Sequence, residues 1–214
     1  FYRLGIRHAL LAYNVRNTVA DGCAERTDSG LSRWGVEVVR EMNRVGMIVD
    51  GTHSGYRSTM EAMEICSAPF IFSHSNVHSI VPHYRNIKDD QIDACAATGG
   101  GIGINGLGEF LDDVEASSES IFRHIDYVAQ RVGVRHVGLG SDYVQDVEQF
   151  WDWVGDTATM WPDKEGAPRR RTAFSQPEQV YELVELMLRA NWSEQDIRGV
   201  LGENFLRICD AVWQ

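Results

Sequence analysis

Two histidines stand where a pair of metal ligands would be expected. His53 and His74 each directly follow a short apolar run, one strand–helix unit apart along the chain. Neighbouring parallel strands lie about 4.8 Å apart, so imidazoles at equivalent heights on them can share one metal ion. Neutral imidazole is a good zinc ligand. The alternative is two buried histidines bonded to the backbone, but the position of both at strand ends favours the metal pair.

An aspartate and an arginine add further chemistry. Asp142 ends another apolar run, and a carboxylate buried at such a position must be paired, hydrogen-bonded or metal-bound. Beside a metal-bound water it could accept a proton and pass it on; otherwise it is a capping or loop residue. Arg85 could grip a carboxylate through two parallel hydrogen bonds, unless it is a surface arginine. His78 and His83 share its loop, and a third ligand among them is conceivable, although loop histidines are more often bystanders.

These side chains require a scaffold that gathers strand ends in one place. A short apolar strand, a polar residue and an amphipathic helix recur in that order five times. The predicted strands cover residues 8–12, 47–51, 70–72, 101–104 and 136–139. Strands that alternate with helices indicate a parallel sheet with right-handed crossovers, and strands that are apolar throughout indicate burial on both faces. The Trp-rich region 143–175 shows no clear pattern.

The polar strand ends decide between a doubly wound open sheet and a (β/α)8 barrel. In a barrel all strand ends converge on one mouth, whereas an open sheet gathers only those near its switch point. The glycine-rich run 99–103 enters a strand instead of opening a helix, so it is no phosphate cradle. The sequence therefore predicts an α/β fold of the (β/α)8 type.

Composition restricts the partners. The formal net charge of −11 argues against nucleic acid, and no apolar run approaches the roughly 18 to 20 residues of a membrane span. The four cysteines form no CxxC pair, so they indicate no zinc ribbon and leave a disulfide open. The compartment is not fixed, with a soluble cytoplasmic location slightly favoured.

Several stretches resemble the membrane (renal) dipeptidase family of zinc metallopeptidases, and they follow its order over nearly the whole chain. They are residues 21–25, 30–32, 43–50, 68–75, 85–86 and 138–142. The resemblance implies a (β/α)8 barrel with two zinc ions bridged by a hydroxide, which hydrolyses dipeptides and tolerates a D-residue at the C-terminal position. It also implies that His53 and His74 bind one zinc, that Arg85 holds the substrate carboxylate, and that Asp142 moves the proton to the leaving amine.

The departures from the family pattern concern the first half of such a barrel. A His-x-Asp at the end of the first strand and a bridging glutamate at the end of the third are expected and are not present. The five predicted strands then correspond to the fourth through eighth, and a barrel of eight cannot close on five. We expect an upstream segment on the order of 100 residues, and we expect that residues 1–214 alone, as a single C-terminal domain portion, do not hold both metals.

Two departures concern the substrate. A family histidine that contacts the substrate is placed at Asn14, beside Tyr13, and asparagine donates a hydrogen bond but does not titrate near neutrality. The family often continues with Phe-Asp-Gly after the aspartate, whereas this chain has Tyr143, Val144 and Gln145. These differences leave substrate preference open.

The predicted function is zinc-dependent hydrolysis of small peptides by a metal-bridging hydroxide. A related amidohydrolase acting on a cyclic amide or lactone is one alternative, and a non-catalytic or incomplete barrel is another. The Trp-rich segment from Trp151 to Trp161 could form a homodimer contact or a lid over the mouth.

Overall fold

The chain folds around a parallel sheet of five strands in the order β1-β2-β3-β4-β5. The computed structural model describes residues 1–161 and 171–214. The strands are β1 (His8–Leu10), β2 (Ile48–Asp50), β3 (Phe70–Phe72), β4 (Gly101–Asn105) and β5 (Val137–Gly140), each within two residues of its predicted bounds. A doubly wound sheet reverses its strand order at a switch point. Here each strand pairs with its predecessor, so the chain winds in one direction, as it does along a barrel wall.

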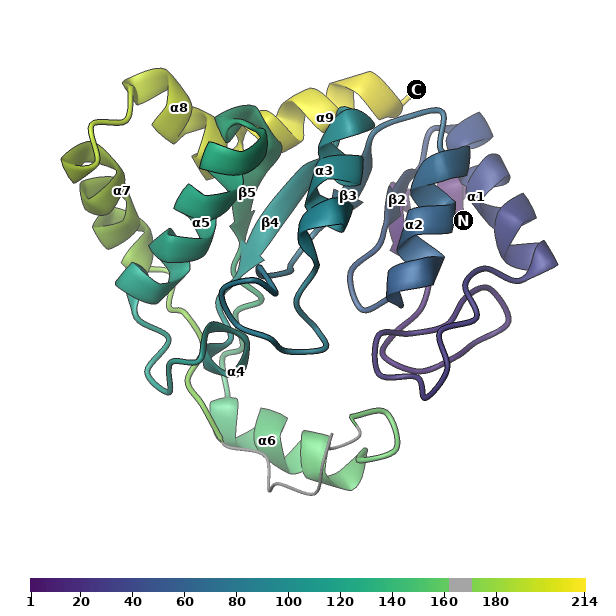
Figure 1. The fold of residues 1–214 in the computed structure, drawn as a ribbon, viewed down its shortest axis with the longest axis horizontal. Coiled ribbons are helices and arrows are strands. Elements are labelled where there is room, and N and C mark those ends of the chain that lie inside the picture. Colours follow the sequence, from purple (N-terminus) through teal and green to yellow (C-terminus); the bar gives the residue numbers. More distant parts are fainter. Residues whose placement is uncertain (162–170) are drawn as a thin grey trace.

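Helices follow the strands and cover one face of the sheet (Figure 1). The α-helices are α1 (Arg33–Val45), α2 (Tyr56–Ile65), α3 (Asp89–Ala97), α4 (Gly108–Leu111), α5 (Ser118–Val132), α6 (Val147–Asp156), α7 (Gln179–Arg189), α8 (Glu194–Arg198) and α9 (Asn204–Val212). The 3₁₀ segments are Tyr2–Leu4 and Val134–His136, and a π-helical turn spans Gly199–Glu203.

Local sequence signals set the helix ends. The Ser32 hydroxyl accepts a hydrogen bond from the amide of Gly35 and caps the start of α1, and Gly46 with φ 81° ends it. Both roles are typical of these residue types, because serine caps helix starts and glycine adopts the left-handed conformation at helix ends. Ser193 likewise caps α8 by accepting from the amide of Asp196. Such caps fix where each crossover leaves and rejoins the sheet.

The two faces of the sheet carry different side chains. Phe70, Phe72 and Ile102 are fully buried in the main core beneath the helices. On the opposite face, Ile48 and Ile71 pack against Ile208 and Val212 of α9 in a smaller apolar cluster. A Cβ atom added to Gly138 would come within 2.7 Å of the Phe205 ring. Glycine is therefore required where α9 approaches the strand backbone.

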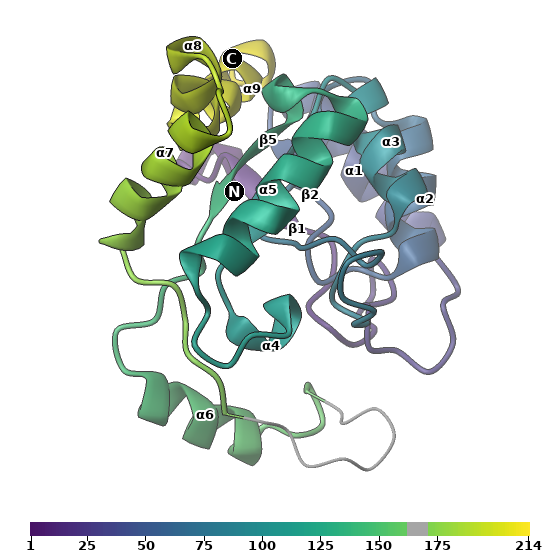
Figure 2. The same cartoon turned by 60° about the vertical axis from the view of Figure 1, so that its left-hand side comes forward.

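The loops that follow the five strands gather at one edge of the sheet, together with α4 and α6 (Figures 1 and 2). Helix α6 lies in the region for which the sequence showed no pattern. Trp151 and Trp161 are buried there in a second apolar cluster, whereas Trp153 is 42% exposed. Two of the three tryptophans are thus covered by their own chain, and the homodimer stays a prediction.

Two remaining expectations concern chemistry and environment. No disulfide joins the four cysteines Cys23, Cys66, Cys95 and Cys209, all of which lie in the described part of the chain. Within residues 1–161 and 171–214, no helix combines the length and apolar character that crossing a bilayer requires.

Candidate active site

The two histidines singled out in the sequence lie side by side. His53 follows β2 and His74 follows β3, and their Nε2 atoms are 3.0 Å apart. The rings meet edge to face, with centroids 5.0 Å apart. Adjacent parallel strands bring the two residues to the same edge at the same height, as their positions predicted.

The outer nitrogen of each ring has a partner that orients it. His53 Nδ1 lies 2.7 Å from Oδ1 of the fully buried Asn14, and His74 Nδ1 lies 2.8 Å from the Ser73 hydroxyl. Because the Asn14 amide oxygen only accepts, His53 Nδ1 carries the proton and its Nε2 presents a lone pair. This is the arrangement in which a second residue orients a metal-ligating imidazole.

Asp50, which the sequence analysis did not single out, ties the two histidine turns together. Its Oδ1 accepts from the backbone amides of Thr52 at 2.9 Å and Ser73 at 3.1 Å, the residues just before His53 and His74. Asp50 is fully buried, and its Oδ2 has no hydrogen-bond partner. An aspartate at the end of an otherwise apolar, buried strand is unusual, and this feature of the sequence could have pointed to Asp50.

Arg85 is buried against the pair. It is 2% exposed, and its Nη2 donates to the His74 carbonyl at 3.1 Å and lies 3.5 Å from His53 Nε2. The guanidinium also lies 5.0 Å from the Phe110 ring centroid. The alternative of a surface arginine is therefore excluded. Burial, and then the Arg85 charge, lower the pKa of both histidines, which keeps the imidazoles neutral and able to bind a metal.

Tyr13 forms the opposite wall of the His53 ring. The two rings stack with centroids 4.1 Å apart, and Trp161 meets both edge-on. Burial raises the pKa of Tyr13 to about 12, against an opposing effect of Arg85. Its hydroxyl therefore stays protonated near neutrality and can donate a hydrogen bond to a substrate.

Asp142 lies at the end of β5 and is exposed, not buried as a barrel-mouth position suggested. Its Oδ2 accepts from Asn105 Nδ2 at 3.0 Å. The Asp142 charge opposes the lowering of the His74 pKa, so the carboxylate lies within electrostatic range of the pair. Asp142, His53 and Asn14 all have positive φ, of 54°, 64° and 58°. Such backbone strain is concentrated at functional sites.

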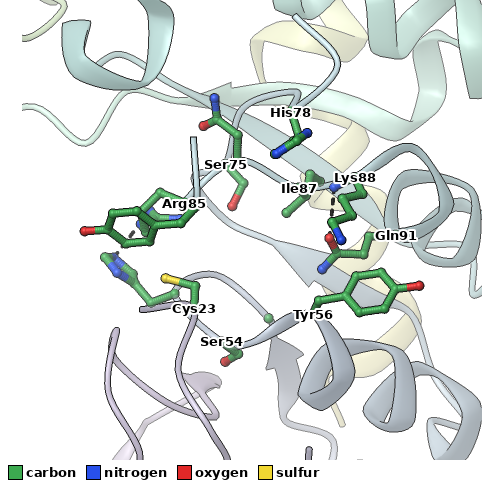
Figure 3. A pocket seen from close by; sticks show the side chains of 13 residues that line it. Cys23, Ser54, Tyr56, Ser75, His78, Arg85, Ile87, Lys88 and Gln91 are labelled. Carbon is green, nitrogen blue, oxygen red and sulfur yellow. Dashed lines mark hydrogen bonds between the residues drawn. The ribbon is translucent and has the colours of Figure 1, made fainter. Parts of the chain in front are cut away.

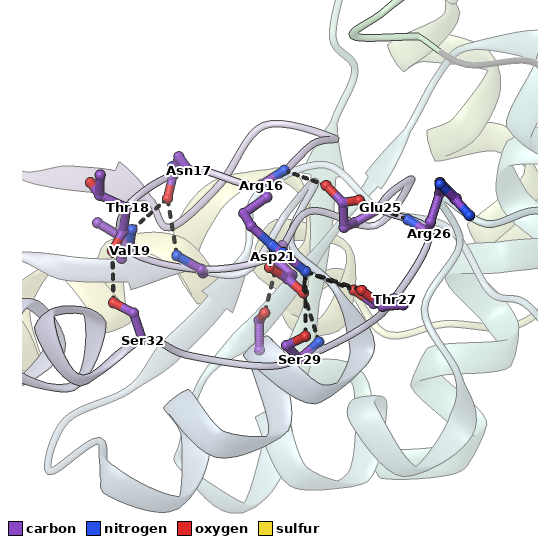
Figure 4. Close-up of polar contacts among 12 residues, drawn as sticks. Arg16, Asn17, Thr18, Val19, Asp21, Glu25, Arg26, Thr27, Ser29 and Ser32 are labelled. Atoms are coloured by element: carbon purple, nitrogen blue, oxygen red, sulfur yellow. Dashed lines mark hydrogen bonds and ion pairs between the residues drawn. The ribbon is translucent and has the colours of Figure 1, made fainter.

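The long loop from β1 to α1, which carries Asn14, is held by ionic and polar contacts (Figure 4). Arg16 pairs with the buried Asp21, with Nη2 to Oδ2 at 2.9 Å, and its backbone amide donates to Glu25. A Cβ on Gly22 would lie 2.1 Å from the Asn14 carbonyl carbon. The loop thus fixes Asn14 through close backbone packing that only glycine permits.

A cavity of about 320 Å³ opens next to His53 and Arg85 (Figure 3). It runs to the start of α2 and α3, where Tyr56, Lys88 and Gln91 line it. These residues were missed because no apolar strand precedes them directly. Their proximity to the histidines depends on how neighbouring crossovers pack.

The histidine pair fits a metal such as zinc. Zinc binds imidazole nitrogen at about 2.0–2.1 Å, so two nitrogens 3.0 Å apart can both contact one ion between them. In the described part of the chain, no group of three or more His, Cys, Asp or Glu is arranged to hold a metal. His83 lies 3.5 Å from Glu109, and neither His83 nor His78 belongs to such a group in the described residues.

Comparison with known proteins gives a consistent picture. Residues 1–161 match the family described as membrane dipeptidase, peptidase family M19. Dipeptidase verJ of Clonostachys rogersoniana is 33% identical over 99% of this chain and 50% of its own length. An amidohydrolase from Pseudomonas aeruginosa superposes with a TM-score of 0.85 at 31% identity, over 99% of this chain and 66% of its own.

A metallopeptidase from Rhodobacter sphaeroides, solved with a phosphinate mimic of L-Ala-D-Ala, shares the fold with a TM-score of 0.77. It is 23% identical over 99% of this chain and 57% of its own. The chain spans about half the length of the curated relatives it matches. With a family match over residues 1–161 and this site geometry, the chain belongs to the membrane dipeptidase family of peptidases.

Proposed function

We propose that the protein is a zinc-dependent dipeptidase that acts on dipeptides with a free C-terminal carboxylate. The observation that carries the proposal is the His53–His74 pair, 3.0 Å apart, with the buried Arg85 in contact with both residues. Relatives over nearly the whole chain are named dipeptidases, and the Rhodobacter sphaeroides metallopeptidase was solved with a dipeptide mimic.

We further propose that the five strands are the fourth to eighth of a (β/α)8 barrel. The sequential strand order and the half-length coverage of relatives support this. In the described residues β1 is an edge strand whose one neighbour is β2, so its other edge can pair with a preceding strand. A preceding segment would then supply the remaining ligands and complete a two-zinc site.

Each site residue has a role that its surroundings support. When bound, the metal polarises the scissile carbonyl and lowers the pKa of water. His53 and His74 would hold it, in orientations set by Asn14 and Ser73. Arg85 binds the free carboxylate, which fixes the peptide in register. The Tyr13 hydroxyl and the Asn14 amide contact the substrate near the scissile bond.

Asp142 is the proposed proton carrier. An exposed carboxylate at the mouth exchanges protons with solvent rapidly, and its hydrogen bond from Asn105 leaves its second oxygen available. It would take a proton during attack and deliver it to the leaving amine. Dipeptide cleavage needs both transfers, since the amine leaves poorly as an anion.

The test is hydrolysis by the full-length, zinc-loaded protein of Ala-Ala and of its C-terminal amide. We expect the wild type to cleave only the free acid efficiently. In Arg85→Ala the free acid should be cleaved more slowly, chiefly through a higher KM. Equal rates on acid and amide in both proteins would contradict the role of Arg85.

The structural similarity to a protein described as an amidohydrolase keeps a second candidate, hydrolysis of a cyclic amide or lactone. The same assay with a lactone and a cyclic dipeptide separates the two. Zinc content by elemental analysis, on residues 1–214 and on the full-length protein, tests the incomplete-barrel alternative. No zinc on either would contradict the whole proposal.

A further inference from the structure

The cavity next to the histidine pair has a charge opposite to that of the chain. Arg85 and Lys88 line it, and among the described residues that line it none is Asp or Glu. The whole chain has 31 acidic residues against 20 Lys and Arg. A cationic cavity in an acidic protein is suited to an anionic ligand.

Two buried polar groups at this cavity lack partners. Ser75 is 1% exposed and its hydroxyl has no hydrogen-bond partner; Figure 3 shows it among the side chains that surround the space. The Arg85 Nε is also buried and without a partner. Buried polar groups are normally satisfied in native proteins, so both point to a ligand that accepts hydrogen bonds.

Lys88 places a second cation at the rim. Its Nζ lies 4.5 Å from the Tyr56 ring centroid, which holds the ammonium over the entrance to α2. Lys88 is also the N-cap of α3, and helix N-termini favour negative charge. The neighbouring carboxylate of Asp90 accepts a hydrogen bond from the Tyr56 hydroxyl, so it is already engaged outside the lining.

We propose that this cavity binds the side-chain carboxylate of an aspartate or glutamate at the C-terminal end of the dipeptide. The inference rests on the proposed function, because it takes Arg85 to hold the main-chain carboxylate. Lys88, with the Ser75 hydroxyl as donor, then receives the second carboxylate. A volume of about 320 Å³ is at the small end of ligand pockets and accommodates an acidic side chain in preference to a large aromatic one.

The test compares matched substrates that differ only in charge. The full-length, zinc-loaded protein is assayed with Ala-Glu and Ala-Gln, and with Glu-Ala and Gln-Ala. We expect kcat/KM for Ala-Glu to exceed that for Ala-Gln by roughly tenfold or more, as for one added charge-assisted hydrogen bond. For Glu-Ala and Gln-Ala, in which the acidic residue or its amide comes first, we expect similar kcat/KM values.

Variants assign the preference to the cavity. Lys88→Met should reduce the preference for Ala-Glu over Ala-Gln to within about twofold, mainly through a higher KM for Ala-Glu. Lys88→Arg should restore most of the preference. Arg57→Met removes a neighbouring cation that pairs with Glu61 outside the cavity and should leave the preference intact.

The outcomes separate this inference from the proposed function. If the protein cleaves Ala-Gln and Ala-Glu equally well, or keeps the preference in Lys88→Met, the acidic subsite is wrong while the dipeptidase stands. A preference that appears only for Glu-Ala would also overturn it. If no dipeptide is cleaved, the proposed function itself fails.

Discussion

The two ends of the candidate site are built differently. At the ends of β2 and β3, His53 is 4% exposed and has contacts from Asn14, Tyr13 and Arg85. At the end of β5, Asp142 is exposed, and Asn105 is the one side chain in the described structure recorded as its hydrogen-bond donor. The difference shows that this chain preorganises the proposed metal ligands by itself. The carboxylate instead remains open to solvent and to any segment that packs beyond β5.

The two ends share one property, a left-handed backbone. His53 and Asp142 have φ values of 64° and 54°, a conformation that costs a residue with a Cβ about 1–2 kcal/mol. The buried end offsets this cost with dense contacts. The exposed end has fewer contacts to offset this cost. We therefore expect substitutions at the two ends to have clearly different effects on metal binding and activity.

The largest expected effect is at the buried end. His53→Ala in the full-length protein should remove metal by elemental analysis and lower dipeptide hydrolysis by about a thousandfold or more, since several kcal/mol of carbonyl polarisation are lost. His78→Ala, in the neighbouring loop, should keep its metal. Full metal content in His53→Ala would rule out the ligand role.

At the exposed end, Asp142→Asn should lower kcat by about a hundredfold, as for loss of general acid–base catalysis, and leave metal content unchanged. Asp112→Asn is a matched control, because Asp112 is also an exposed aspartate with positive φ. Loss of metal in Asp142→Asn would instead identify Asp142 as a ligand.

The supporting asparagines sharpen the comparison. In Asn14→Gly, the glycine can adopt the φ of 58°, but the hydrogen-bond partner of His53 is lost. Zinc affinity, measured by chelator competition, should therefore fall about tenfold. Asn105→Ala should change zinc affinity by less than about twofold, because its partner Asp142 is solvated. Equal losses in both would show that the two ends are coupled.

A histidine outside the site should affect the stability of the protein and not its chemistry. His124 is fully buried and its Nδ1 accepts from the Val77 amide at 3.0 Å; burial lowers its pKa to about 3. The unfolded chain therefore binds a proton near the ordinary pKa of 6.5 before the folded one does, and stability falls as the pH drops from 6.5 towards 3.

Between about pH 7 and pH 5 this histidine should account for about 2 kcal/mol of the lost unfolding free energy. Urea unfolding of wild type and His124→Gln at both pH values measures it. The variant should show a shallower decline, and parallel declines would mean that other groups, such as His53, are responsible.

Position along the chain predicted that His53 and His74 lie side by side, but it did not predict the contacts that hold them. His53 and His74 were predictable because each follows an apolar strand in consecutive units. The Asn14–His53 hydrogen bond joins residues 39 positions apart, and it depends on a loop held by Arg16 and Gly22. Pattern reasoning has no means to place such a contact.

The sequence did not predict two further features, helix α6 and the exposure of Asp142. Helix α6 buries only Trp151 and Val154, so its apolar stripe is too short to stand out. The exposure of Asp142 depends on what packs beside β5, which local sequence does not encode. The sheet order itself followed from the repeated strand–helix pattern, because short crossovers place successive strands side by side.

The sequential strand order also affects how the molecule is made. Each strand from β2 onward pairs with the strand synthesised just before it, so no pairing has to wait for a strand that is translated later. Domains fold from the N-terminus as the chain leaves the ribosome. His53 and His74 therefore meet once β3 has joined β2, while the segment that bears Asp142 is still being translated. A nascent chain would hold its imidazole pair before it holds Asp142, the proposed proton carrier.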